Sequence, residues 1–191
     1  MKLPNPQYVS PELIFNKRWG KELQYIDWKR FEKLAERYKG GLFLDAGCFN
    51  SPLIIELKKR YPQSEFIGLD KSRSVLMELQ RRHPEVRYVV GDVMALQFKD
   101  EHFDYIVCAE LLEHLENPEG AVKELIRVLK KGGILAISVP DNEAENGRVS
   151  PDHIWSFTKE DIQKLLTPYG ETEVLPYKDT VKHLIAYCRK K

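Results

Sequence analysis

The chain has 191 residues, which is enough for one well-packed core and short for two domains. A hydrophobic fraction of 42%, a charged fraction of 31% and a net charge of +1 are typical of an ordinary soluble domain and argue against nucleic acid or an anionic membrane as a partner. Its 3 scattered cysteines exclude a disulfide framework, and no apolar run approaches the roughly 18 residues of a membrane span, so we expect a cytoplasmic protein.

The first part of the chain is expected to cover the domain that follows. Residues 1–18 contain several prolines and predict an irregular lead-in. Apolar residues then recur at helical spacing over Lys21–Tyr38, before a pair of glycines. We therefore predict one domain over 1–191, with an N-terminal helical cover (1–40) and a Rossmann-like core (41–191).

An apolar run between glycines predicts the first strand of the core. Leu42–Leu44 is too short for a helix and apolar throughout, as in a parallel strand buried on both faces. Asp45 ends the strand, and Gly47 follows in a tight turn that favours a residue without a Cβ. Ser51 then offers a helix N-cap, and Pro52 fits the first helical position. This combination predicts a nucleotide cradle, because ligands of such sheets lie beyond the carboxyl ends of the strands.

Strands and helices continue to alternate along the chain. Further strands are expected at 65–70, 86–90, 103–109 and 134–139, with helices at about 54–61, 72–83, 117–129 (stopped by Gly132 and Gly133) and after a Thr158–Asp161 capping box. This alternation predicts an α/β fold with a doubly wound, mostly parallel sheet. Residues 171–175 and 183–188 form two last strands, and their connection is too short for a crossover helix. They must therefore pair as an antiparallel hairpin.

The glycine turn does not fit a dinucleotide cofactor. The fingerprint G-x-G-x-x-G would require glycine where Phe49 and Pro52 stand. The stretch instead resembles motif I of the class I S-adenosylmethionine (SAM)-dependent methyltransferases, an acidic residue followed by G-x-G-x-G. Asp45 and Gly47 match that motif, whereas Phe49 and Ser51 replace its later glycines. SAM has an amino acid end and no phosphate, so it demands less of the loop.

Acidic residues also follow the next two strands. Asp70 ends one of them, where a carboxylate can accept hydrogen bonds from both hydroxyls of a ribose, and the stem of Lys71 can pack on the adenine. Asp92 and Val93 resemble the adenine-binding motif, in which the carboxylate accepts from the exocyclic amine and a backbone N–H serves a ring nitrogen. Any single aspartate would equally well cap a helix or form a turn. Acidic residues at the ends of successive strands favour a SAM site.

The resemblance is strongest from the fourth predicted strand to the fifth. The run FDYIVCAELLEHL at 103–115, followed by RVLKKGG at 127–133, looks like the large superfamily typified by the ubiquinone-biosynthesis O-methyltransferases (methyltransferase type 11). This resemblance implies a seven-stranded Rossmann-like sheet in the order 3-2-1-4-5-7-6. It also implies that SAM is the cofactor, held by Asp45, Ala46, Gly47, Cys48, Asp70, Lys71, Asp92, Val93 and Ala109.

Three residues after the fourth strand carry candidate chemistry. Glu110, Glu113 and His114 are spaced i, i+3, i+4, so one helical turn would place all three on one face. In one interpretation His114 is a general base for the acceptor, and Glu113 or Glu110 orients its imidazole. In the other, the carboxylates and the imidazole hold a divalent ion such as Mg²⁺ or Mn²⁺, which polarises an acceptor hydroxyl.

A later segment bears on the metal interpretation. Residues 152–158 (DHIWSFT) are similar to the corresponding stretch of small-RNA 3′-terminal 2′-O-methyltransferases and of some ubiquinone-pathway enzymes, in which E-x-x-E-H and a distant histidine bind the metal. Glu110, Glu113, His114 and His153 match this set residue for residue. In the alternative, His153 only hydrogen-bonds within its own loop. The remaining histidines are expected to be structural or exposed: His83, His102 and His183.

The patterns together favour a SAM-dependent methyltransferase acting on oxygen, nitrogen or carbon of a small molecule, with His114 and Glu113 as catalytic residues. The length leaves no room for a separate substrate domain, and no N/D-P-P-Y/F tetrad marks a nucleic acid base methylase. One alternative is a metal-assisted RNA 2′-O-methyltransferase. Another is a SAM-binding regulatory module without turnover, because Phe49 and Ser51 replace motif glycines.

Overall fold

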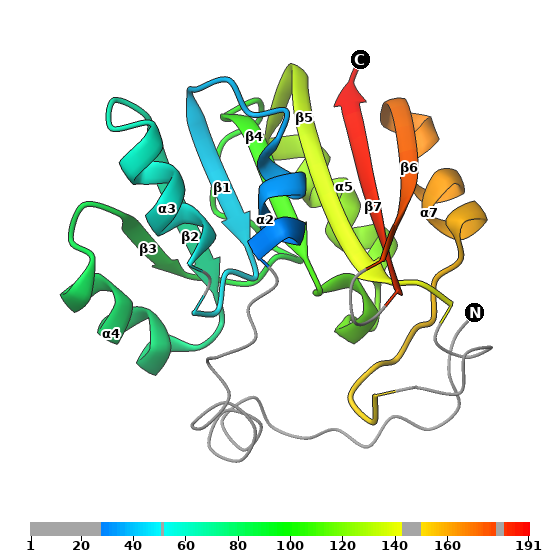
Figure 1. The fold of residues 1–191 in the computed structure, drawn as a ribbon, viewed down its shortest axis with the longest axis horizontal. Helices are drawn as coiled ribbons and strands as arrows, with labels where there is room; N and C mark the ends of the chain where they lie inside the picture. The colour runs from blue at the N-terminus through cyan, green and yellow to red at the C-terminus, as the bar shows by residue number, and fades with distance from the viewer. Residues whose placement is uncertain (1–27, 51, 143–149, 179–181) are drawn as a thin grey trace.

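A computed structural model of the chain contains one seven-stranded sheet in the order β3-β2-β1-β4-β5-β7-β6 (Figure 1). The structure describes residues 28–50, 52–142, 150–178 and 182–191. The predicted lead-in, the beginning of the first predicted helix and the Ser51 N-cap lie outside the described residues. The predicted sheet order is confirmed, and so is the antiparallel hairpin.

Five parallel strands and one antiparallel hairpin build the sheet. The strands are β1 (Leu42–Ala46), β2 (Glu65–Asp70), β3 (Arg87–Val90), β4 (Phe103–Ala109), β5 (Leu129–Pro140), β6 (Gly170–Lys178) and β7 (Lys182–Lys190). Because β7 runs antiparallel to β5, His183 near its beginning pairs with Pro140 at the end of β5. The first residues of β7 therefore join the carboxyl edge of the sheet, where ligands of parallel α/β sheets bind.

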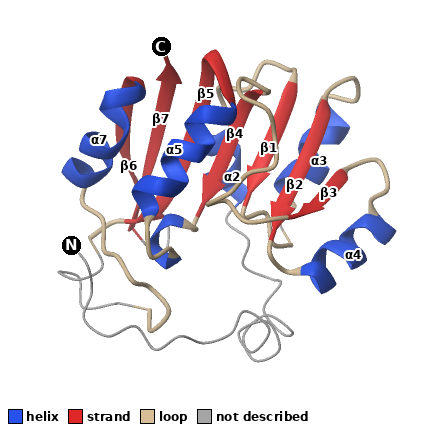
Figure 2. Ribbon diagram, turned by 180° about the vertical axis from the view of Figure 1, so that it is seen from behind, coloured by secondary structure: helices blue, strands red, loops and turns tan. Residues whose placement is uncertain are grey.

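Helices cover both faces of the sheet. In the view of Figure 1, α2 (Trp28–Ala35) and α3 (Leu53–Arg60) lie in front of it, and Figure 2 shows α5 (Pro118–Val128) and α7 (Lys159–Leu166) on the other side. The remaining helix, α4 (Arg73–Arg82), packs beside β3. Short 3₁₀ turns complete the described elements: η2 (Leu112–His114) and η3 (Thr167–Tyr169).

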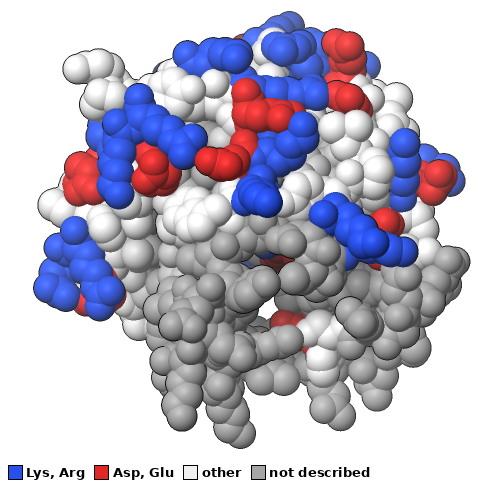
Figure 3. All heavy atoms as spheres, in the orientation of Figure 1, with Lys and Arg blue, Asp and Glu red and all other residues white. Residues whose placement is uncertain are grey.

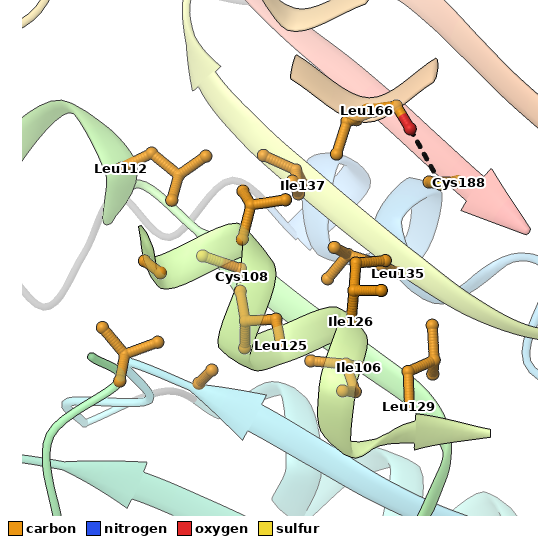
Figure 4. Packing of buried hydrophobic residues seen from close by; sticks show 14 of the residues in the cluster. Ile106, Cys108, Leu112, Leu125, Ile126, Leu129, Leu135, Ile137, Leu166 and Cys188 are labelled. Atoms are coloured by element: carbon orange, nitrogen blue, oxygen red, sulfur yellow. Dashed lines mark hydrogen bonds between the residues drawn. The ribbon is translucent and has the colours of Figure 1, made fainter. Parts of the chain in front are cut away.

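The face under α5 carries the larger apolar cluster, shown in Figure 4. Ile106 of β4 and Leu135 and Ile137 of β5 pack there with Leu125 and Ile126 of α5. Burying one such side chain stabilises the fold by about 1.5–3 kcal/mol. Because this packing fixes β4 and β5 against α5, it also fixes the polar residues that follow these strands.

The junction between α5 and β5 differs from the prediction. The helix ends at Val128, and the strand begins directly at Leu129 rather than after the glycine pair. Gly132 has a φ of 74°, and the pairing register between β4 and β5 shifts next to it. The glycines form a bulge inside the strand, because a left-handed residue interrupts a ladder without ending it.

Helix caps follow the sequence at some positions and not at others. The Asn117 side chain accepts a hydrogen bond from the Gly120 N–H at 2.9 Å, and Thr158 forms the predicted capping box with Asp161. Pro52, in contrast, is the N-cap residue of α3 rather than its first helical residue. Ser72 is the N-cap residue of α4 but makes no side-chain capping bond.

Candidate functional site

The turn after β1 is held by the backbone of β2. The N–H groups of Gly47 and Cys48 both donate to the Leu69 carbonyl, at 2.8 and 3.0 Å. Gly47 has a φ of 77°, and a Cβ at this position would lie 2.8 Å from Cδ2 of Leu111. Both the left-handed backbone and the approach of Leu111 therefore require glycine, in agreement with the motif.

Phe49 stands where the methyltransferase motif has its second glycine. Its φ is 43°, a conformation that costs a residue with a Cβ about 1–2 kcal/mol. The Phe49 N–H donates to Oδ2 of Asp70 at 3.0 Å, and this bond ties the turn to the end of β2. The turn thus keeps the left-handed step for which glycine is preferred, although its residue is aromatic.

Asp70 is the last residue of β2, Asp92 follows the neighbouring strand β3, and both accept backbone hydrogen bonds. The second oxygen of Asp70, Oδ1, accepts from the Ser72 N–H at 2.8 Å. Oδ1 of Asp92 accepts from the Met94 N–H at 2.9 Å, and Oδ2 of Asp92 lies 3.1 Å from Nζ of Lys71. Burial raises the pKa of Asp92, but these two donors more than offset it and hold the pKa below its usual value. Each carboxylate oxygen can accept a second hydrogen bond, so both aspartates can also bind a nucleoside.

The other residues predicted to bind SAM lie at the same edge of the sheet. Asp45 in β1 is aligned with Gly68 of β2 and Val107 of β4. Three further residues of the predicted SAM site are buried: Ala46, Cys48 and Val93. Ala109 is the last residue of β4. The strands bring these residues to one edge, and their roles toward SAM stay predictions.

Glu110 lies in a cluster that the sequence did not predict. Its Oε1 lies 2.8 Å from Oγ of Ser138 and 2.8 Å from Nη1 of Arg30, and its Oε2 lies 3.1 Å from Nε2 of His183. Burial raises the pKa of Glu110, but the hydrogen bond from His183, the charge of Arg30 and the hydrogen bond from the Ser138 hydroxyl lower it to about 2. Glu110 is therefore ionised, and it joins α2, β5 and β7.

The predicted helical face of Glu110, Glu113 and His114 is wrong for its first member. Glu110 has a φ of 49°, and the helical turn begins only at Leu112. A left-handed residue directs its side chain away from the face of the following turn, so Glu110 turns toward β5 and β7. His183, which was expected to be structural or exposed, has a structural role as a partner of Glu110.

The other three predicted metal ligands do come together. One ligand atom each from Glu113, His114 and His153 lies within 4.8 Å of the other two. The rings of His114 and His153 are 4.7 Å apart and nearly perpendicular, and Glu113 is buried. The donor set is one carboxylate and two imidazoles, which suits a transition metal such as Mn²⁺ better than Mg²⁺.

The segment that carries His153 is fastened to η2 by main-chain bonds. The Glu113 carbonyl accepts from the N–H groups of Ile154 and Trp155 at 2.7 and 3.1 Å, and the Trp155 indole donates to the Leu115 carbonyl at 2.8 Å. These bonds hold two stretches that are about forty residues apart in the sequence. The site is therefore positioned by backbone contacts and not only by its side chains.

His114 has a defined tautomer. Its Nδ1 lies 3.0 Å from the Asp152 carbonyl, which only accepts, so Nδ1 carries the proton of the neutral ring and Nε2 is the acceptor. Burial lowers the pKa of His114, although the Asp152 carbonyl opposes this effect. The imidazole is therefore neutral at pH 7, and Nε2 can take a proton or bind a metal.

Sequence reasoning missed Arg30, Ser138, His183 and the role of Asp152. A signal existed for His183, because the first residues of an antiparallel last strand must lie at the carboxyl edge of the parallel ones. Asp152 lies directly before the predicted ligand His153, and this position is the signal that could have indicated its role. For Arg30 and Ser138 the sequence contains no comparable signal.

A seven-stranded sheet in this order, with a glycine turn after its first strand, is the arrangement that the resemblance to class I methyltransferases implies. The family model described as "Methyltransferase domain" matches residues 44–137 of this chain. Among the described residues, no helix combines the length and the apolar character needed to cross a bilayer.

Curated relatives are named as methyltransferases, and solved structures share the fold. The chain is 27% identical over 147 residues to a "Probable S-adenosylmethionine-dependent methyltransferase" of Mycolicibacterium smegmatis, covering 73% of this chain and 55% of that protein. It is 36% identical over 116 residues to the demethylmenaquinone methyltransferase of Staphylococcus carnosus, covering 58% and 48%. The chain thus spans about half the length of these relatives. The crystal structure of the PH0226 protein from Pyrococcus horikoshii shares the fold, with a TM-score of 0.70 at 20% identity over 88% of this chain and 94% of that one.

Proposed function

We propose that this domain binds SAM and catalyses transfer of its methyl group to a small molecule. The observation that carries the proposal is the turn after β1. Gly47 there has the left-handed backbone of the methyltransferase motif, and Asp70 holds the turn from the next strand. The names of the relatives support the same activity.

In this proposal each aspartate binds a different part of the cofactor. Asp70 would accept from the ribose hydroxyls, Asp92 with the Val93 N–H would hold the adenine, and Gly47 with Asp45 would face the amino acid end. When bound, SAM supplies a methyl group that its sulfonium has already activated. The protein then mainly has to align the acceptor with that methyl, an effect that can contribute about 7–11 kcal/mol.

An acceptor that must lose a proton would use His114. Its neutral imidazole has Nε2 as acceptor, and the Asp152 carbonyl fixes the ring through Nδ1. An acceptor that arrives as a neutral amine would not need this base. We propose a small acceptor, because two relatives are named for small molecules, demethylmenaquinone and trans-aconitate.

Ligand-dependent stability tests the proposed cofactor. SAM at about 100 times its dissociation constant should add about 2.7 kcal/mol to the free energy of unfolding. For a domain of this size that raises the melting temperature by about 5–10 °C. A melting temperature unchanged by SAM and by S-adenosylhomocysteine would refute the proposal. A shift without methyl transfer to any acceptor pool would instead favour the regulatory module.

One observation favours a second, metal-assisted version of the same function. Glu113, His114 and His153 offer ligand atoms within 4.8 Å of one another, at the end of the sheet where the acceptor would lie. A divalent ion held there would polarise an acceptor hydroxyl, and His114 would then be a ligand rather than a base. The two versions are therefore mutually exclusive at His114.

Metal binding separates the two versions. If the site holds a metal, calorimetry with Mn²⁺ should give one binding event that His153→Ala removes. His83→Ala is the matched control, because His83 follows α4 and is not part of the trio; its Nδ1 lies 3.5 Å from Oε1 of Glu85. Methyl transfer that proceeds equally in Mn²⁺ and in a chelator would leave His114 as the base.

A further inference from the structure

A cavity lies at the opposite edge of the sheet from the proposed SAM site. It has a volume of about 500 Å³ and is lined by the loop after α2, the beginnings of β4 and β5, and the end of β7. Asp104 in its wall and Glu110 are separated by the length of β4, about 20 Å at the rise of an extended strand. The cavity is therefore separate from the carboxyl edge.

Cationic side chains gather around this cavity. Five of them line it: Arg37, Lys39, Lys130, Lys131 and Arg189. Figure 3 shows Lys and Arg atoms gathered along the upper part of the molecule, the edge at which β7 ends in Figure 1. The whole chain has a net charge of only +1, so this concentration of positive charge is local.

The two acidic residues of the lining are already engaged by other groups. Asp104 accepts from Nζ of Lys130 and from the Leu42 N–H, at 2.7 and 2.8 Å. Glu36 accepts from Nζ of Lys33 at 2.7 Å and from the Tyr187 hydroxyl at 3.1 Å. Of the cavity's cations, Lys130 is thereby neutralised, and Arg37 is paired with Glu173.

The other three cationic side chains of the cavity are not paired with a carboxylate among the described residues. Within the part of the chain that the structure describes, no ion pair joins Lys39, Lys131 or Arg189 to a carboxylate. Nη1 of Arg189 donates to the Gly132 carbonyl at 2.8 Å, which orients the guanidinium without cancelling its charge. Three uncompensated positive charges thus face one cavity.

The backbone beside these charges is open. Gly132 has a φ of 74°, and a Cβ built on it would meet no atom within 4 Å. The left-handed backbone therefore accounts for the glycine, and the space beside it remains available to a ligand. A cavity of this size lies within the range of about 300–1,000 Å³ that small-molecule sites occupy.

From these observations we infer that the cavity binds a small phosphoryl oxyanion with two or more negative charges, such as a pyrophosphate group. Arginine pairs with phosphate oxygens through two parallel N–H bonds, and lysines add point charges to the same oxyanion. Lys39 and Lys131 come from segments far apart in the sequence, so they can contact a ligand from two sides. SAM carries positive charges at its sulfonium and amino groups, so it does not suit this site.

Calorimetry with inorganic pyrophosphate at constant ionic strength tests the inference. We expect saturable binding at millimolar concentration or below, and about tenfold weaker affinity in the double variant Lys39→Gln/Lys131→Gln. Both lysines are exposed, so the variant should fold normally and bind SAM like the unmodified protein. The matched control is Lys59→Gln/Lys123→Gln, which removes the same charge from exposed positions outside the cavity and should leave pyrophosphate binding intact.

Three results would overturn the inference. The first is that pyrophosphate does not bind at millimolar concentration. The second is that both double variants lose affinity equally, because an equal loss would indicate a general effect of charge. The third is that citrate, tested at the same ionic strength, binds more tightly than pyrophosphate, which would contradict the assignment to phosphoryl groups. None of these results depends on SAM binding, so the proposed methyltransferase function is tested separately.

Discussion

The two halves of the carboxyl edge are built in different ways. In the half formed by the ends of β1, β2 and β3, which we call the cofactor half, short contacts join backbone N–H groups to Leu69 and Asp70. In the half formed by the ends of β4 and β5 and the beginning of β7, the acceptor half, side chains from distant elements converge on Glu110, and the ring of His153 lies against that of His114.

This difference explains which changes of sequence each half of the edge can accommodate. A backbone-built turn depends on a few local conformations, so one motif in the sequence can encode it. A cluster such as Glu110, Arg30 and His183 depends on where α2 and β7 are placed, so it can change with each acceptor while the sheet stays the same. Mutations in the two halves should therefore have separable effects.

The largest separable effect is expected at Asp70. Replacing Asp70 with Ala removes the carboxylate proposed to hold the ribose, and two charge-assisted hydrogen bonds are together worth about 2.7 kcal/mol, or about a hundredfold in SAM affinity. Calorimetric titration with SAM measures this loss. Glu78→Ala, which removes an exposed carboxylate of α4, should bind SAM normally. Unchanged affinity in Asp70→Ala would remove the basis of the proposed function.

A smaller effect, on stability rather than affinity, is expected at Glu110. Replacing Glu110 with Gln leaves Arg30 and His183 without their shared anion and should lower the free energy of unfolding by about 2 kcal/mol at pH 7. SAM affinity should be unchanged if the two halves are independent. Denaturant unfolding with and without SAM measures both quantities.

The loss of stability in the Glu110→Gln variant should depend on pH. The pKa of Glu110 is lowered to about 2 in the folded protein from 4.5, so the unfolded chain binds the proton more readily. The stability contributed by Glu110 is therefore fully present above pH 4.5 and is lost as the pH falls toward 2. The difference between the variant and the unmodified protein should shrink over this interval. A difference that stays constant would show that ionised Glu110 is not what stabilises the cluster.

The sequence predicted the two halves unequally for the same physical reason. Strand and helix periodicity predicted the alternating elements, and the resemblance to class I methyltransferases implied the sheet order. Asp45, Gly47 and Asp70 marked the cofactor half because each lies at or just after the end of a strand. Spacing failed at Glu110, where a left-handed residue replaced the expected helical turn. Arg30 and Ser138 carry no local signal, because their role arises only from the packing of α2 and β5 around Glu110.

The stabilities of two Phe49 variants test the backbone conformation of the turn in the cofactor half. Phe49→Gly and Phe49→Ala both remove the aromatic ring, but only glycine adopts the φ of 43° without a Cβ clash. The glycine variant should be more stable than the alanine variant by about 1 kcal/mol, measured by thermal or denaturant unfolding. Equal stability would mean that the turn does not hold the left-handed step in solution. The comparison needs no SAM, so it tests the turn itself.

The smallest effect is expected at His114, and it tests whether burial in the acceptor half lowers the pKa of this imidazole. Burial lowers the pKa of His114, so the unfolded chain binds the proton more readily than the folded one. Stability should therefore fall as the pH drops below the ordinary histidine value of 6.5, and His114→Gln should reduce this fall. Titration of the ring by nuclear magnetic resonance gives the pKa directly. A pKa at or above 6.5 would contradict the expectation that burial makes the folded protein bind this proton less readily than the unfolded chain. Because the cofactor half binds through aspartates and backbone groups, SAM affinity should not follow this titration.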